Sequence, residues 1–260
     1  MASVVPKETK VVRGVVLRRD PAREPCFDLV HLHDEVPDIG GLGPEHRRQR
    51  VHRDYNQEVQ NLEVTALCLV DFPEMPWELR VELARQCWDE ARHAALFYRR
   101  LKEMGGWKGM FAIANLDWSV VGMLDSLAAR LAVQHRTFEA GSLDIGQQTI
   151  PQWRAMGDDT TADIMEAVDA DEIPHVRFAN DWLKRLADAE PRTVLQVAAA
   201  MTWLRRVVAV TGGTTMHPIA TSTESRELAG FSATEVSQVA RLEQQLLATS
   251  APHEEGQNHA

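Results

Sequence analysis

Residues 89–93 read Asp-Glu-Ala-Arg-His, and residues 171–175 read Asp-Glu-Ile-Pro-His. Each stretch contains a glutamate that is followed three positions later by a histidine. In an α-helix, residues three apart lie on the same face, so the two side chains of each pair can bind one metal ion. One such pair is commonly a surface salt bridge, but two pairs in one chain predict a shared site.

The residues around both pairs predict that the pairs face the core. Apolar side chains recur at helical spacing before and after each pair. The stripe on the first helix contains Leu79, Leu83, Phe97 and Leu101, and that on the second contains Ile164, Val168, Ala179, Trp182 and Leu186. A buried carboxylate is costly unless it is paired or bound to a metal. We therefore predict that the two pairs share a buried cation.

The chain has a helical pattern from Pro44 onwards, so the predicted fold class is all-α. We predict helices over Pro44–Asp71, Trp77–Glu103, Asp117–Gly141, 157–187, Pro191–Val210 and Ala233–Ala248, with a short helix at Ile150–Met156. Residues 1–43 are rich in Pro, Gly and charge, show no alternating β-pattern, and are predicted to form an extended N-terminal arm. Residues 44–249 are predicted to form the helical domain, and residues 250–260 a disordered tail.

The remaining ligands are expected on the other two long helices. In helical bundles, a site with two Glu-x-x-His pairs takes one more glutamate from each of the two remaining helices. Glu139 continues the apolar stripe of the third helix and is the candidate there. The first helix offers Glu58 and Glu63. If the turn is centred near Glu74, Glu58 lies level with Glu90, whereas Glu63 is displaced by about 7.5 Å. We favour Glu58, with Glu63 as the alternative.

The predicted site combines carboxylates with imidazoles. Its ligands are Glu58, Glu90, His93, Glu139, Glu172 and His175. Carboxylate and neutral imidazole suit iron or manganese better than a structural zinc, which favours thiolates. Two divalent ions would balance the four carboxylate charges. Asp171 is a candidate to orient a ligand on the facing helix, and Asp89 precedes its glutamate in the same way. His135 is more typical of a core histidine than of a ligand.

Composition narrows the classes of function. The 260-residue chain has a formal net charge of −10, which argues against tight non-specific binding to nucleic acid or to an anionic membrane. Cys26, Cys68 and Cys87 form no CxxC pair, as expected of reduced cytosolic thiols. The N-terminus lacks an apolar signal core, and the most apolar stretch, Val194–Val210, is predicted to be a buried helix rather than a membrane span. We therefore expect a cytoplasmic protein.

Several segments resemble a family of bacterial ferritin-like proteins known only as a domain of unknown function. These are residues 58–63, 89–93, 138–144 and 171–175, and residues 224–232 resemble the family's C-terminal signature. The resemblance covers most of the chain. It implies a ferritin-like four-helix bundle with extra C-terminal helices, and it implies the same six ligands. Asn56 departs from the family pattern, in which histidine is common there, and Pro174 stands where glycine is common.

The expected function is that of a non-haem di-iron oxidoreductase. Such a site activates O₂ to hydroxylate, desaturate, N-oxidise or rearrange a small-molecule substrate, and it can require an external electron donor. Manganese–iron and di-manganese pairs use nearly the same ligands. The alternatives are an iron-handling ferroxidase or storage protein, and a tRNA-modifying hydroxylase, against which the acidic charge counts. A homodimer through an apolar helix face is the default expectation for the assembly.

Two further features carry hypotheses. Pro174 lies inside the helix predicted over 157–187 and removes a backbone donor, so it is expected to kink or loosen the helix and could open a coordination position. Several tryptophans could help to wall a substrate pocket, although core packing is the more common role of this residue. They are Trp88, Trp118, Trp153, Trp182 and Trp203.

Overall fold

The computed structural model describes residues 7–31, 43–211 and 220–250, with the backbone alone for residues 242–250. α-Helices dominate this part of the chain, which confirms the all-α class. The helices are α1 (Pro44–Asp71), α2 (Trp77–Glu103), α3 (Leu116–Val121), α4 (Leu127–Val133), α5 (Ala140–Ala155), α6 (Asp159–Ala189), α7 (Arg192–Thr211), α8 (Thr223–Leu228) and α9 (Ala233–Ser250). A π-helical segment, η2 (Gln134–Glu139), joins α4 to α5, and the strands β1 (Thr9–Val12) and β2 (Val15–Arg18) form an antiparallel hairpin.

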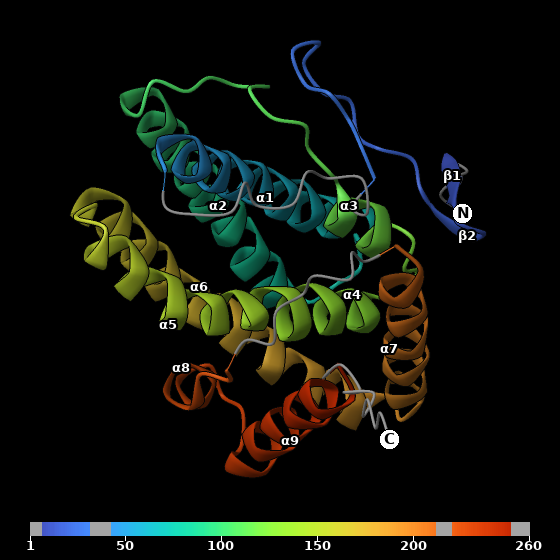
Figure 1. Ribbon diagram of the computed structural model, residues 1–260. Coiled ribbons are helices and arrows are strands. Elements are labelled where there is room, and N and C mark those ends of the chain that lie inside the picture. The colour runs from blue at the N-terminus through green and yellow to red at the C-terminus, as the bar shows by residue number, and fades with distance from the viewer. Residues whose placement is uncertain (1–6, 32–42, 212–219, 251–260) are drawn as a thin grey trace, which may run out of the picture.

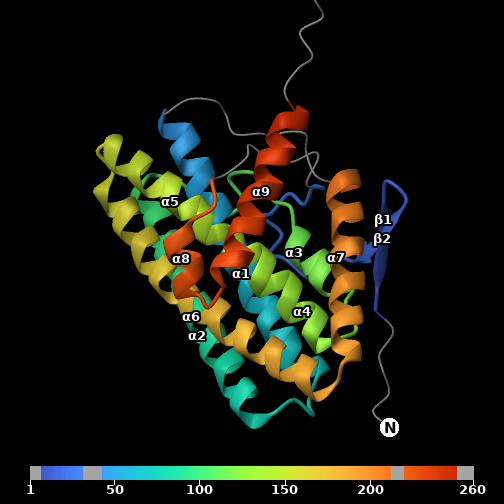
Figure 2. The same cartoon turned by 90° about the horizontal axis from the view of Figure 1, so that it is seen from below.

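Two pairs of long helices enclose the interior (Figure 1). One pair is α1 with α2, and the other is the continuous α4–η2–α5 with α6. The two pairs meet where α6 packs against α2. α7 packs against α4 at one side, next to the hairpin, while α8 contacts α5 and α6 on the outer side (Figure 2).

The first two helices have the predicted bounds. Pro44 follows Gly43 and occupies the first turn of α1, where its missing N–H is not needed. The turn after α1 contains two prolines, which cannot continue a helix. α6 begins at Asp159, two residues after the predicted start, because the Asp158 carboxylate caps it by accepting a hydrogen bond from the Thr161 backbone N–H at 3.0 Å.

The predicted N-terminal arm contains a β-hairpin, although no β-pattern was predicted there. Val12, Val15 and Leu17 of the hairpin are at most 6% exposed and belong to the core shared by α1, α3, α4 and α7. Both central residues of the turn have positive φ, 47° at Arg13 and 80° at Gly14, as a two-residue hairpin turn requires. The strands have four residues each, so their alternation is too short to stand out in the sequence.

The third predicted helix, Asp117–Gly141, is both interrupted and longer than predicted. Residues 122–126 separate α3 from α4, and Ser126 caps α4 by accepting a hydrogen bond from the Ala129 backbone N–H at 3.4 Å. The helix then continues through η2 into α5, which includes most of the short helix predicted at Ile150–Met156. Gly141, the predicted end of the helix, costs about 1 kcal/mol within a helix. The packing of α5 against α6 outweighs that cost.

The C-terminal part also differs from the predictions. Ser222 caps α8, which lies where no helix was predicted, by accepting a hydrogen bond from the Ser225 backbone N–H at 3.4 Å. α9 begins at Ala233 as predicted. Ser250 of the predicted tail belongs to α9, and the rest of that tail, residues 251–260, lies outside the described residues.

The prediction that α7 is buried is wrong. Ala200, Leu204 and Val207 form its buried side, whereas Val194 and Leu195 are 59% and 71% exposed. Among the described helices, α7 alone is long and apolar enough to cross a membrane by length and composition, and 22% of that stretch is buried. A single helix of this kind is weak evidence for a membrane protein.

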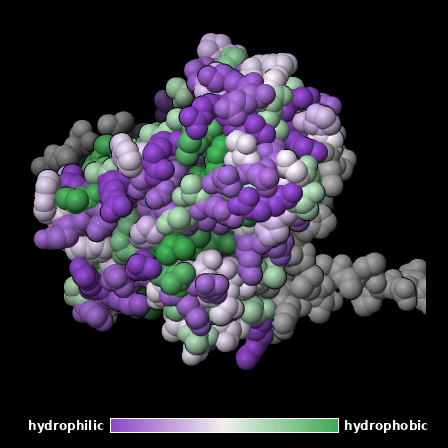
Figure 3. Space-filling view, turned by 90° about the vertical axis from the view of Figure 1, so that its left-hand side faces the viewer, coloured by the Kyte–Doolittle hydropathy of each residue, from purple (hydrophilic) through white to green (hydrophobic). Residues whose placement is uncertain are grey.

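The face at the α5–α6 turn is largely hydrophilic, with apolar side chains in its recesses (Figure 3).

Candidate metal centre

The six predicted ligands lie together in the interior between α1, α2, η2 and α6. All of them are at most 7% exposed: Glu58, Glu90, His93, Glu139, Glu172 and His175. Ligand atoms of four lie within 4.8 Å of one another, and so do those of a second group of three. We call the first group, Glu58, Glu90, His93 and Glu172, the His93 position, and the second, Glu139, Glu172 and His175, the His175 position. Glu172 belongs to both.

Each of these six side chains has one buried atom without a hydrogen-bond partner among the described residues. The atoms are Oε2 of Glu58, Glu90, Glu139 and Glu172, and Nδ1 of His93 and His175. An unsatisfied buried polar group costs about 1–3 kcal/mol, so six in one place need a common partner. Metal ions accept lone pairs from carboxylate oxygens and imidazole nitrogens together. The donor set therefore fits one or two bound cations.

Two glutamates face both histidines. Glu90 Oε2 lies 3.4 Å from His93 Nδ1, and Glu90 Oε1 lies 3.7 Å from His175 Nδ1. Glu172 mirrors this arrangement, with Oε1 3.7 Å from His93 Nδ1 and Oε2 3.4 Å from His175 Nδ1. Glu172 belongs to both ligand groups and can therefore bridge the two positions, whereas Glu90 belongs to the His93 position alone. Glu58 Oε2 lies 3.4 Å from His93 Nδ1 and completes the first.

The other nitrogen of each histidine binds an aspartate on the opposite helix. His93 Nε2 on α2 lies 3.1 Å from Asp171 Oδ2 on α6, and His175 Nε2 on α6 lies 3.2 Å from Asp89 Oδ2 on α2. An ionised carboxylate only accepts hydrogen bonds, so each Nε2 is the donor and each Nδ1 faces the cluster. Arg92 donates to both aspartates. This pairing orients both imidazoles.

The electrostatics of the site also favour bound cations. Burial raises the pKa of Glu58, Glu139 and Glu172 well above the usual range of glutamate, and neighbouring carboxylates raise it further. Burial acts the same way on Glu90, but the neighbouring imidazoles of His93 and His175 lower the pKa of Glu90 overall. Burial alone lowers the pKa of His93, but Glu58 and Glu90 outweigh it and raise that pKa to about 11. A cation bound here would displace protons.

The π-helical segment η2 carries the fourth carboxylate. A π-helix has more residues per turn than an α-helix, and in η2 Gln134, His135 and Glu139 are all buried. Gln134 Nε2 donates to Glu139 Oε1 at 3.4 Å and to Asn61 Oδ1 at 3.0 Å. η2 therefore brings both a ligand and its hydrogen-bond donor inward. A regular helix was the expectation here, and the sequence shows no signal for the π-turn.

Residues 4–237 match the family described as protein of unknown function, DUF455. The chain belongs to this family. No curated protein and no solved structure matches it. For this DUF455 protein, a proposed function therefore rests on the six side chains that meet in the interior.

The DUF455 chain places the two candidate glutamates of α1 differently. Glu58 lies in the His93 position, whereas Glu63 forms a bidentate ion pair with Arg23, with Nη2 and Oε2 2.7 Å apart. The short, two-proline turn between α1 and α2 sets the register that brings Glu58 level with Glu90. Asn56 donates to the backbone carbonyl of Ala114 at 3.2 Å, outside the two ligand groups.

His135 lies beside the centre. It is 1% exposed, and burial lowers its pKa to about 3. Its ring packs edge-on against Phe178 with centroids 5.3 Å apart, and its Nε2 lies 2.9 Å from Gln86 Oε1. Gln86 was missing from the predicted site, although it occupies the stripe position between Leu83 and Glu90. A polar residue at that position was the available signal.

Pro174 leaves α6 continuous from Asp159 to Ala189. The side chain is exposed, and so is Ala170, whose carbonyl lacks the usual helical donor. Water can satisfy that carbonyl, which explains why the helix persists.

The tryptophans mostly pack in apolar clusters. Trp153 is 1% exposed, and Trp118, Trp182 and Trp203 pack against buried clusters. Trp88 is 65% exposed and lies under Arg92, so it is neither core nor a wall of the centre.

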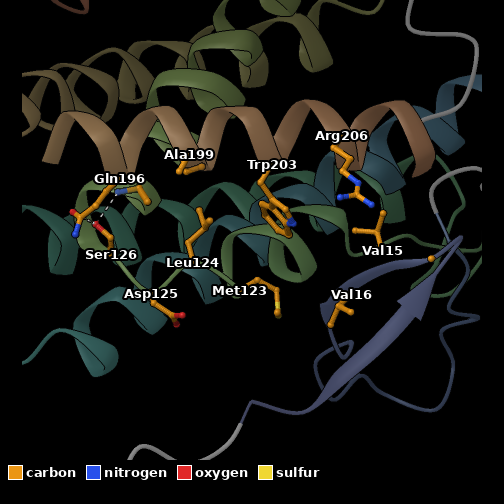
Figure 4. A pocket seen from close by; sticks show the side chains of 13 residues that line it. Val15, Val16, Met123, Leu124, Asp125, Ser126, Gln196, Ala199, Trp203 and Arg206 are labelled. Carbon is orange, nitrogen blue, oxygen red and sulfur yellow. Dashed lines mark hydrogen bonds between the residues drawn. The ribbon is translucent and has the colours of Figure 1, made fainter. Parts of the chain in front are cut away.

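A separate groove of about 690 Å³ lies between β2, the α3–α4 connection and α7. Val15, Leu124 and Trp203 line it; Ser126 is hydrogen-bonded to Gln196 at one end, and Arg206 lies at the other (Figure 4). None of its lining residues is a candidate ligand. The groove is therefore not part of the candidate metal centre.

Proposed function

We propose that this protein is a ferritin-like di-iron carboxylate enzyme that uses O₂ to oxidise a small-molecule substrate. The observation that carries the proposal is the convergence of six unpartnered ligand atoms, from four helical segments, on one buried volume. The two antiparallel pairs of long helices that enclose this volume support the ferritin-like assignment. Manganese could replace one or both iron ions with the same ligands.

Each side chain of the centre has a defined task in this proposal. Glu172 would hold both ions together, Glu58 and Glu90 would bind the ion at the His93 position, Glu139 would bind the ion at the His175 position, and His93 and His175 would each bind one ion through Nδ1. Asp171 and Asp89 keep the histidine tautomers fixed. Iron held there would supply the activation of O₂. The apolar clusters on both sides of the centre exclude bulk water from it, and electrons would come from an external donor.

The first test is metal content together with reactivity toward O₂. Protein purified without chelator is analysed by plasma mass spectrometry, reconstituted anaerobically with ferrous iron, and exposed to O₂ while the near-ultraviolet spectrum is recorded. We expect close to two iron ions per chain and a new absorption band after O₂ is added. Glu90→Ala and Glu172→Ala serve as controls, and each should lose at least one ion. A single zinc ion, or no metal, would contradict the proposal.

The same preparation separates this function from iron handling. A ferroxidase or storage protein would accumulate many iron ions per chain and form a very large particle. An oxidase of small molecules keeps about two ions per chain, and size-exclusion chromatography would show a small assembly such as a dimer. Copurification with tRNA would instead favour the hydroxylase alternative.

A further inference from the structure

Gln86 is a buried carboxamide that touches two of the four carboxylates in the centre. It is 0% exposed and lies one helical turn before Glu90 on α2. Its Nε2 donates to Glu90 Oε1 at 3.0 Å and to Glu139 Oε1 at 2.7 Å. The opposite orientation would point its carbonyl oxygen at two carboxylates, so these contacts fix which end is the donor.

His135 holds this amide in place from behind. Its Nε2 lies 2.9 Å from Gln86 Oε1, and a carbonyl oxygen can only accept, so Nε2 carries the proton. Both ends of the Gln86 amide are therefore satisfied by groups inside the core. A side chain tied at both ends is a fixed donor to the carboxylates.

The hydrogen bonds donated by Gln86 affect the two metal positions differently. At the His93 position, Glu58 Oε2, Glu90 Oε2 and His93 Nδ1 have no partner among the described side chains. The oxygen of Glu90 that faces the other position, Oε1, lies 3.7 Å from His175 Nδ1 and already accepts a hydrogen bond from Gln86.

Glu139 is affected in the same way. Its Oε1 accepts hydrogen bonds from Gln86 and Gln134, which leaves Oε2 for a metal. An ion at the His175 position thus meets three side chains, where an ion at the His93 position meets four. The further oxygens near the His175 position, Glu90 Oε1 and Glu139 Oε1, both accept a hydrogen bond from Gln86, which withdraws electron density from them and weakens their donation to a metal.

We propose that Gln86 is a positioning residue that makes the two metal positions unequal, so that the His93 position fills first and the His175 position binds its ion more weakly. The inference rests on the proposed metal centre. It also assigns the incompletely coordinated position, the one open to a small exogenous ligand, to the side of His175 and η2.

The test is an anaerobic titration of the metal-free full chain with Mn²⁺, followed by electron paramagnetic resonance. In the wild type, one equivalent should give the hyperfine signal of isolated Mn²⁺, and the signal of a coupled pair should appear only beyond it. Gln86→Met keeps the length of the side chain but removes the donor. We expect the ratio of the two dissociation constants to fall at least about tenfold, since a hydrogen bond to a charged group is typically worth that much.

Gln60→Met is the matched control. Gln60 is 2% exposed, and its amide donates to the backbone carbonyl of Ala114, away from the centre. This variant loses a buried amide as well but should keep the wild-type ratio. A wild type whose two ions bind equally, or a Gln86→Met variant with an unchanged ratio, would overturn the role of Gln86 and leave the metal centre standing.

A second measurement covers the case in which Gln86→Met does not fold. Wild-type crystals grown with one equivalent of Mn²⁺ should show anomalous density mainly at the His93 position, and equal density at both would overturn the inference. Failure of the wild type to bind any Mn²⁺ or iron would instead remove the metal centre, and with it the proposed function.

Discussion

At the scale of single residues, the centre is defined by the atom of each side chain that lacks a partner. In both His93 and His175, Nε2 is hydrogen-bonded to an aspartate on the opposite helix and Nδ1 faces the centre. Glu90 and Glu172 each direct one oxygen toward each histidine. The reciprocity between α2 and α6 means that neither helix can move without disturbing both imidazoles.

The two glutamates of α1 give the sharpest prediction at this scale. Glu58→Ala should lower the metal content by about one ion per chain, because it removes a side chain of the His93 position. Glu63→Ala should retain two ions, since Glu63 is engaged by Arg23. Plasma mass spectrometry on both variants, purified in parallel, measures the difference. The reverse ranking would assign the ligand role to Glu63 and refute the hairpin register.

At the scale of elements, the centre depends on one irregular helix and on one regular helix that contains a proline. η2 forms a π-helical segment within the continuous helix from α4 to α5 and buries Gln134, His135 and Glu139. α6 stays regular through Pro174. The π-helical turn η2 thus lies where the sequence contains no proline or glycine, whereas Pro174, which usually breaks a helix, does not interrupt α6.

Pro174→Ala tests what the proline contributes. The alanine restores the hydrogen bond to the Ala170 carbonyl, so the free energy of unfolding should rise by about 1–3 kcal/mol. Metal content should stay at two ions, because the neighbouring ligands are held by contacts with α2. Chemical denaturation and metal analysis measure the two effects. Loss of an ion in this variant would instead support an opening of the coordination shell by the proline.

At the scale of the whole molecule, the ion-free centre makes stability depend on pH. Glu58, Glu139 and Glu172 have raised pKa values in the folded state, as does His93, whose pKa is about 11. Groups that bind protons more tightly when folded stabilise the protein at low pH, and this stabilisation is lost as pH rises from the unfolded pKa toward the folded one. Glu90, with a lowered pKa, acts in the opposite direction but is outnumbered.

The melting temperature should therefore respond to pH and metal together. With chelator present, it should fall as pH rises from about 5 to 8, because the unfolded-state pKa of glutamate is about 4.3 and that of histidine about 6.5. Added Mn²⁺ should raise it more at pH 8 than at pH 6, since fewer protons must be displaced. Anaerobic thermal scans measure both trends. Glu90→Ala, which should lose at least one ion, is the control, and added Mn²⁺ should raise its melting temperature less. An equal metal effect at both pH values would contradict the assigned protonation.

Local sequence patterns were sufficient to predict most of the candidate ligands and the register of the first two helices. The Glu-x-x-His pairs within core stripes identified four of the six side chains, because residues three apart share a helix face. The prolines between Asp71 and Trp77 set the register that selects Glu58. Only the tertiary structure showed the hairpin at residues 9–18, the π-turn in η2 and the Gln86 hydrogen bonds. The hairpin packs against α1, α3, α4 and α7, η2 packs against α6, and Gln86 meets Glu139 and His135, so each feature depends on residues far away in the chain that local propensity does not include.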